Sequence, residues 1–180
     1  MSHTLTAYFV APSALRSFWG SRNAGPVADE LADDLAELSA WMEDLDVPPD
    51  VSARAILQDI ADGSIRHEDT AAFAYGYVYE HLCALFGDRA GPDEDGGGPG
   101  YTLRDVGEIE RDASAFIPIP ISDDSPHVAS YGLGDLQTAR ARLTAAARTH
   151  AEANDRSARQ LGALFDRAEA EGTGVVLFTS

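Results

Sequence analysis

The side chains best suited to chemistry lie close together in residues 72–83, AFAYGYVYEHLC. Glu80 and His81 are adjacent there, one turn after Tyr77. A carboxylate or imidazole that is partly removed from water can act as a general base, so these three residues are candidate catalytic groups of a hydrolase-like enzyme. The structural alternative is that Glu80 pairs with an arginine and His81 bonds a backbone carbonyl or a tyrosine hydroxyl.

Two further tyrosines of this stretch, Tyr75 and Tyr79, are candidate ligand-binding residues. Their rings could stack on a ligand in a tyrosine-lined pocket, or they could lie in the core with hydrogen-bonded hydroxyls. The single cysteine, Cys83, follows two residues after His81. We expect its thiol to be inert in an apolar helix, and an intrachain disulfide is excluded, which fits a reducing compartment.

A second candidate cluster is made of Asp123, Asp124 and His127. These residues lie in a loop directly after a predicted strand, which is a common position for functional side chains. Their oxygen and nitrogen atoms could hold a metal ion, but a fourth ligand is missing, and such trios also arise by chance. The sequence therefore indicates no confident metal site, and it predicts no cofactor.

Several familiar catalytic patterns are absent from the sequence. It contains no G-x-S-x-G, no phosphate-binding G-x-x-x-x-G-K, no H-E-x-x-H, no dinucleotide-binding glycine pattern and no C-x-x-C. All 13 basic residues are arginine, so Schiff-base chemistry on a lysine is excluded.

The candidate residues of the first cluster must be positioned by a helix rather than a strand. Apolar residues recur at a spacing of three and four through Tyr75, Val78, Tyr79, Leu82, Leu85 and Phe86. The opposite side is also mostly apolar. This pattern predicts a central, buried helix over residues 72–86.

The remaining patterns predict an α+β fold in one domain spanning residues 1–180. A half-buried strand is expected at residues 4–10, a proline-interrupted edge strand or extended segment at 117–121, and an apolar central strand at 174–179. Helices are expected between them, including an amphipathic one at 27–45. The sheet would be small, mixed or antiparallel, with strands at the N-terminus, middle and C-terminus, and covered by several helices. Residues 87–100, GDRAGPDEDGGGPG, predict a flexible acidic glycine-rich loop.

The charge of the chain limits its partners. With 30 acidic residues against 13 basic ones, the net charge is -17. Such a field repels nucleic acid and anionic membrane surfaces and attracts a basic protein. One face of the helix at 27–45 carries acidic residues alone, either as a solvated face or as a docking surface: Asp29, Glu30, Asp33, Asp34, Glu37, Glu43 and Asp44.

The N-terminus, MSHTLTAYFVAPSALR, has no basic region before its short apolar run, and no apolar stretch reaches the length of a membrane span. We therefore expect a cytoplasmic protein.

Both ends of the chain resemble a known family. MSHTLTAYFVAPSALRSFWG looks like the start of the small bacterial YfbM-like proteins, and LFDRAEAEGTGVVLFTS is similar to their close. The centre, ILQDIADGSIRHEDTAAFAYGYVYEHLCALFG, resembles a group of actinobacterial proteins of unknown function. The resemblance implies a compact α+β domain and assigns no activity and no functional residue.

Taken together, these observations favour a non-enzymatic protein-binding or regulatory module that binds a basic partner. The alternative is a small-molecule enzyme that uses Glu80 and His81 in a tyrosine-lined pocket. A third reading is a soluble domain with no site legible in the sequence. Nothing in the sequence indicates the oligomeric state.

Overall fold

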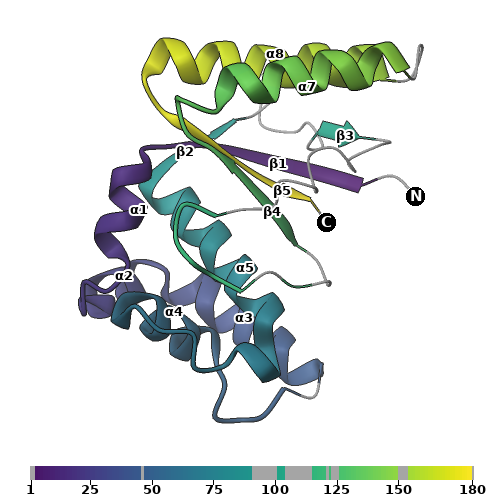
Figure 1. The fold of residues 1–180 in the computed structure, drawn as a ribbon. Helices are drawn as coiled ribbons and strands as arrows, with labels where there is room; N and C mark the ends of the chain where they lie inside the picture. Colours follow the sequence, from purple (N-terminus) through teal and green to yellow (C-terminus); the bar gives the residue numbers. More distant parts are fainter. Residues whose placement is uncertain are drawn as a thin grey trace.

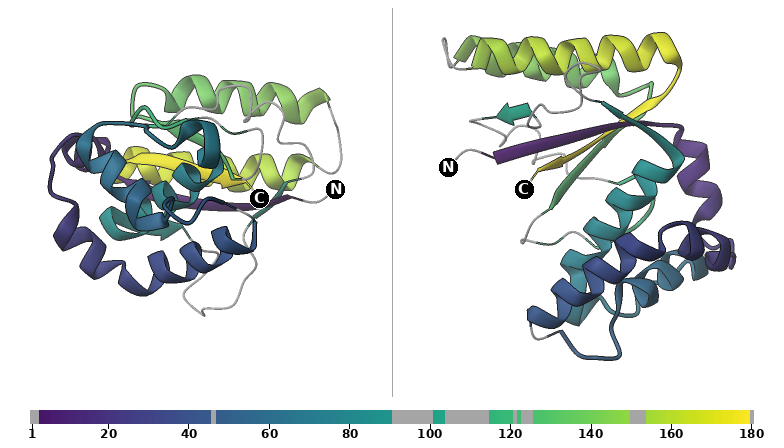
Figure 2. Two further views of the ribbon diagram at one scale, coloured as in Figure 1. Left: turned by 90° about the horizontal axis from the view of Figure 1, so that it is seen from below. Right: turned by 180° about the vertical axis from the view of Figure 1, so that it is seen from behind.

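The computed structural model describes residues 3–45, 47–90, 101–103, 115–120, 122, 126–149 and 154–179 (Figure 1). Within these residues an antiparallel sheet of five strands lies between two layers of helices. The view from behind in Figure 2 shows the same three layers. The arrangement confirms the α+β fold class and resolves the sheet as antiparallel.

The two ends of the chain form the centre of the sheet. Its strands are β1 (His3–Val10), β2 (Gly87–Ala90), β3 (Tyr101–Leu103), β4 (His127–Tyr131) and β5 (Gly174–Thr179). Strand β5 lies between β1 and β4, and Ala7 faces Leu177 across the β1–β5 pair. The other edge of β1 pairs with β2 and, further along, with β3. All six residues of β5 are buried, which confirms the predicted central strand.

Helices cover both faces of the sheet. On one face lie α1 (Pro12–Phe18), α2 (Ala24–Glu30), α3 (Ala32–Asp44), α4 (Ala53–Asp62) and α5 (Glu68–Phe86), and on the other lie α7 (Leu136–Thr149) and α8 (Asn154–Glu171) (Figure 1). Local signals set several helix ends. Pro12 opens α1, the Ser52 side chain caps α4, and Gly63 ends α4 in the left-handed conformation.

Strand β1 is buried on both faces, whereas its alternation predicts a half-buried strand. Ala7 and Phe9 pack in the core beneath α7 and α8. Tyr8 and Val10 point the other way, into the larger core formed with α1–α5. Because Tyr8 has a polar hydroxyl, the sequence pattern places it on the solvent-facing side of the strand. In the structure, its ring instead packs edge-on against Phe178.

The single helix predicted over residues 27–45 is two helices. Leu31, with φ -96° and ψ 19°, separates α2 from α3. The apolar spacing continues across this break, which is why the sequence pattern does not reveal it.

The prediction of a glycine-rich loop over residues 87–100 is wrong for its first four residues. Residues 87–90 form β2, and Asp88 and Arg89 pair with Phe9 and Tyr8. Gly87 fits there because a Cβ would lie only 2.3 Å from the carbonyl oxygen of Phe9. Residues 91–100 lie outside the described residues.

The proline-interrupted segment is extended, and the middle strand follows it. Residues 115–120 form no strand, because Pro118 and Pro120 have no N–H to donate and the N–H of Ile119 turns back to the carbonyl of Ile117 at 2.9 Å. Ile117 is buried over the core, so the extended alternative is the one observed. The strand itself is β4, which begins at His127.

Candidate functional site: an acidic aromatic groove

Helix α5 confirms the predicted central helix, and it divides the candidate residues between its sides. Tyr75, Tyr79 and Cys83 have no exposed surface. Tyr77 and His81 are partly exposed on another side of the helix. The helical period therefore separates residues that are close in sequence, since successive residues differ by about 100° around the axis.

Tyr75 is fixed inside the core by its hydroxyl. This group donates to the carboxylate of Asp59 at 2.5 Å and accepts the backbone N–H of His67 at 3.1 Å. The buried Asp59 also accepts from Nε of Arg66 at 2.6 Å, and its Oδ2 lies 2.8 Å from Nδ1 of His67. The cluster ties α4 to the start of α5. It leaves no face of Tyr75 on which a ligand could stack.

Asp59 is the important residue that the sequence patterns do not single out. Burial would raise the pKa of its carboxyl, but hydrogen bonds from Tyr75, Arg66 and His67 outweigh burial and hold the pKa below its ordinary value. The sequence does contain a signal for this buried role, because Asp59 lies on the same side of α4 as the apolar residues Ile56 and Ile60. A carboxylate on the buried side of a helix needs a hydrogen-bond or ion-pair partner inside the core.

Tyr79 uses its hydroxyl to hold the extended segment against the helix. It accepts the backbone N–H of Phe116 at 3.0 Å and lies 3.5 Å from Oγ of Ser130 on β4. Burial raises the pKa of Tyr79. Like Tyr75, Tyr79 is a core residue with a tethered hydroxyl.

Glu80 and His81 are not brought to one site. Glu80 Oε1 accepts a hydrogen bond from the hydroxyl of Tyr8 at 3.3 Å, and burial raises the pKa of this carboxyl. Its hydrogen-bond partner is thus a tyrosine, while the charge of Arg89 partly offsets the effect of burial on the pKa of Glu80. Burial also raises the pKa of the Cys83 thiol, which keeps it protonated at neutral pH, as expected for an inert cysteine.

His81 and Tyr77 line a shallow groove between α5 and α3. The groove has a volume of about 280 Å³. We call it the acidic aromatic groove, and its residues are Asp34, Glu37, Leu38, Trp41, Tyr77 and His81. Trp41 is 38% exposed, and its ring meets Tyr77 edge-on, with 5.0 Å between ring centroids. Nδ1 of His81 lies 3.8 Å from Oδ2 of Asp34, a contact that is an ion pair only when the imidazole is protonated.

The surface beside this groove is acidic. All seven carboxylates of α2 and α3 are exposed. Among the described residues, Asp29 forms an ion pair with Arg54 at 3.7 Å, and Asp34 forms one with His81 when that imidazole is protonated. Carboxylates, the exposed Trp41 and the partly exposed Tyr77 therefore lie together on one side of the helical layer.

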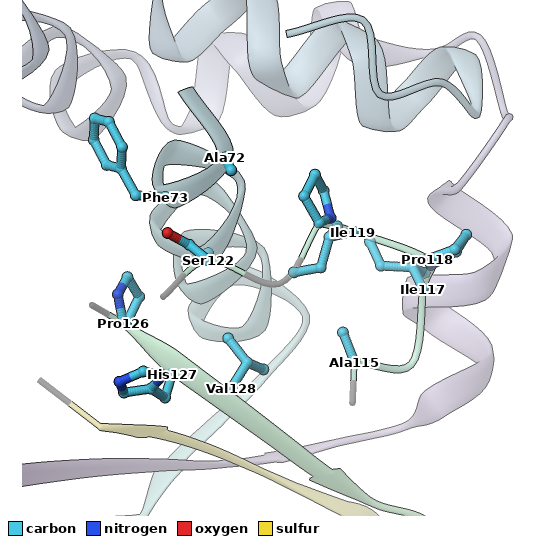
Figure 3. A pocket seen from close by; sticks show the side chains of 12 residues that line it. Ala72, Phe73, Ala115, Ile117, Pro118, Ile119, Ser122, Pro126, His127 and Val128 are labelled. Carbon is cyan, nitrogen blue, oxygen red and sulfur yellow. The ribbon is translucent and has the colours of Figure 1, made fainter. Parts of the chain in front are cut away.

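A second pocket lies beside the start of α5, and the side chains of its lining that the structure describes are mostly apolar (Figure 3). It has a volume of about 240 Å³ and is walled by the start of α5, by residues 115–120 with Ser122, and by the first residues of β4. We call it the proline pocket, because Pro118, Pro120 and Pro126 form part of its wall. Phe73 lines it and meets Trp41 of the groove edge-on at 5.5 Å.

The predicted metal cluster is described only in part. His127 is the first residue of β4, so it lies in a strand rather than in the loop predicted for it. Asp123 and Asp124 lie outside the described residues, and their role as ligands stays a prediction. Among the residues that are described, no three histidine, cysteine or acidic side chains are placed to share a metal ion.

The comparison with known protein families identifies a family for this chain. A family model described as a domain of unknown function, DUF7691, matches residues 1–180. The chain belongs to this family. No curated protein and no solved structure matches it, and the match gives no link to the YfbM-like family or to actinobacterial proteins. In the described part of the chain, every helix is too short or too polar to cross a membrane.

Proposed function

We propose that this chain is a non-enzymatic protein-binding module, and that its acidic aromatic groove receives an arginine or lysine side chain of a basic partner protein. The supporting observation is the placement of the Asp34 and Glu37 carboxylates in one groove with the exposed ring of Trp41 and with Tyr77.

The chemistry of the groove suits a cationic side chain. Carboxylates form charge-assisted hydrogen bonds with a guanidinium or ammonium group. The face of a tryptophan or tyrosine ring attracts the same cation, with about 0.5–1 kcal/mol at exposed sites. Arginine fits both kinds of contact best, because its planar guanidinium binds a carboxylate through two hydrogen bonds and stacks on an aromatic ring.

The charge of the whole chain supports the same kind of partner. A net charge of -17 raises the local concentration of basic proteins and speeds their encounter, while the groove supplies the specific contacts. The proposal also places the module in a reducing cytoplasm, supported by the single, buried Cys83.

The alternative, a hydrolase-like enzyme, has less support. It requires Glu80 and His81 to face one pocket with the tyrosines. Glu80 instead contacts Tyr8, His81 contacts Asp34, and Tyr75 and Tyr79 are enclosed.

Peptide binding to the groove tests the proposal. The chain has two tryptophans, so Trp19→Phe leaves Trp41 as a reporter inside the groove. We expect a tetra-arginine peptide to change the Trp41 fluorescence in a saturable way at physiological salt. A tetra-citrulline peptide, which has nearly the same shape without the charge, should leave it unchanged.

Matched variants distinguish binding in the groove from general attraction by the net charge of the protein. Asp34→Asn with Glu37→Gln removes two groove charges, and Asp50→Asn with Asp88→Asn removes two exposed charges elsewhere. At roughly 0.5 kcal/mol for each carboxylate, the groove variant should bind tetra-arginine about fivefold more weakly. The control should change affinity less than about twofold. Equal losses in the two variants would show attraction by net charge alone and would reject the groove.

A further inference from the structure

His81 lies in the acidic aromatic groove, beside one of the two carboxylates that are proposed to bind the basic partner. Its Nδ1 atom is 3.8 Å from Oδ2 of Asp34. His81 belongs to α5 and Asp34 to α3, and both side chains reach solvent, with exposed fractions of 31% and 53%. The packing of α3 on α5 therefore brings a titratable base next to an acidic residue of the groove.

The proton on His81 changes what Asp34 can bind. A neutral imidazole leaves the Asp34 carboxylate available to an arginine or lysine of the partner. A protonated imidazole pairs with Asp34 itself and adds a positive charge that repels the cation of the partner. Histidine gains its proton between pH 8 and pH 5, whereas a guanidinium is charged throughout this range. The proton and the partner therefore compete for one carboxylate.

Other titratable groups lie near His81 on the two helices that form the groove. Glu37 on α3 is the second carboxylate of the lining, and Tyr77 on α5 lies one turn before His81. Burial raises the pKa of Tyr77, so its hydroxyl stays neutral in this range. Glu80 interacts with the charge of His81, and burial raises the pKa of its carboxyl. Its hydrogen bond is to Tyr8 and it does not line the groove, so it is a second titrating group that needs its own control.

We propose that protonation of His81 releases the basic partner from the acidic aromatic groove, so that the groove binds more tightly at neutral pH than in mild acid. This inference rests on the proposed function of the groove. A positive charge about 4 Å from a bound cation in water weakens binding about fivefold, so we expect tetra-arginine to bind about fivefold more weakly at pH 5.5 than at pH 7.5.

Tetra-arginine affinity at these two pH values tests the inference, with Trp41 fluorescence in the Trp19→Phe protein as the readout. His81→Gln carries no charge at either pH and should bind equally at both. His127→Gln makes the same substitution in the lining of the proline pocket and should keep the fivefold loss. Glu80→Gln removes the second titrating group and should also keep the loss.

The imidazole NMR signals of the natural chain give a second readout that needs no substitution. Binding and protonation are reciprocal, so bound tetra-arginine should make His81 gain its proton at a lower pH. A fivefold coupling corresponds to about 0.7 of a pH unit. The titration of His127 should stay in place. A histidine with a purely structural role would titrate alike with and without the peptide.

The inference and the proposed function fail on different results. Saturable binding with equal affinity at pH 5.5 and pH 7.5, or an unchanged His81 titration in the complex, would overturn the inference and leave the proposed function intact. A loss in acid that persists in His81→Gln, or that disappears in Glu80→Gln, would also overturn it. Absence of saturable binding at pH 7.5 would reject the proposed function, and the inference with it.

Discussion

At the scale of single residues, the buried Asp59 holds together a cluster that no sequence pattern singles out. Its buried carboxylate joins the hydroxyl of Tyr75, the guanidinium of Arg66 and the imidazole of His67. These contacts link α4, the turn after Gly63 and α5, the helix that bears one wall of the groove. The cluster is therefore a structural support for the site rather than the site itself.

Asp59→Asn should destabilise the fold by about 2–3 kcal/mol, because an amide leaves at least one buried donor without an acceptor. Urea unfolding at pH 7 measures this loss. Asp62→Asn, which removes a carboxylate that pairs with Arg66 at the surface, is the matched control and should have a much smaller effect. Equal losses would show that the buried cluster does not carry the stabilisation.

The stability difference between Asp59→Asn and the natural chain should depend on pH. The pKa of Asp59 is lowered on folding, so its contribution is present above the ordinary carboxyl pKa of about 4 and is lost as pH falls through the folded value. Unfolding curves measured from pH 7 down to pH 3 should therefore converge for the two proteins. A constant gap down to pH 3 would contradict this assignment.

Glu80 should show the opposite sign. Burial raises the pKa of its carboxyl in the folded state, so folding favours the protonated form and stability falls as pH rises through the folded pKa. Glu80→Gln keeps an acceptor for Tyr8 and removes this penalty. The variant should gain stability relative to the natural chain between about pH 4 and pH 7, as measured by thermal unfolding. A variant that is relatively less stable at pH 7 would mean that the ionised carboxylate is favourable.

At the scale of elements, the sequence predicts the helices and strands that have a strong apolar period, but it does not predict local departures from that period. Helix α5 and strand β5 follow directly from their patterns. The break at Leu31 and the strand at 87–90 depend on contacts with other elements, which no pattern along the chain records. Glycine content suggested a loop at Gly87, although glycine is needed there because β2 approaches β1 closely.

Gly87→Ala should disrupt this pairing. Its Cβ would lie 2.3 Å from the carbonyl oxygen of Phe9 and 2.6 Å from Cγ2 of Val10. We expect a loss of about 1–3 kcal/mol in chemical unfolding. Gly25→Ala on α2 is the control, because nothing lies within 4 Å of the added Cβ, and its stability should be unchanged or slightly higher. Equal stability of the two variants would contradict the close β1–β2 contact.

At the scale of the whole molecule, the two-sided burial of the sheet decides which surfaces remain for function. One face packs on α1–α5 and the other on α7 and α8, so the surfaces left for function lie on the helical layers. There the acidic face of α3 meets Tyr77 and His81 of α5.

The sequence patterns identify the residues of this groove as separate candidates, but they do not predict that these residues lie next to one another. The acidic residues of α3 belong to the docking-surface hypothesis, whereas Tyr77 and His81 of α5 belong to the enzyme hypothesis. The packing of α3 on α5 joins them, and the helical period separates His81 from Glu80. The choice between an enzyme and a binding module therefore depends on tertiary packing.

Chemical-shift mapping of tetra-arginine binding tests the central claim most directly. At physiological salt we predict the largest shifts at the indole N–H of Trp41 and at Tyr77 and His81, with none from tetra-citrulline. Shifts spread evenly over the exposed acidic residues, or equal shifts from both peptides, would contradict the acidic aromatic groove as the binding site.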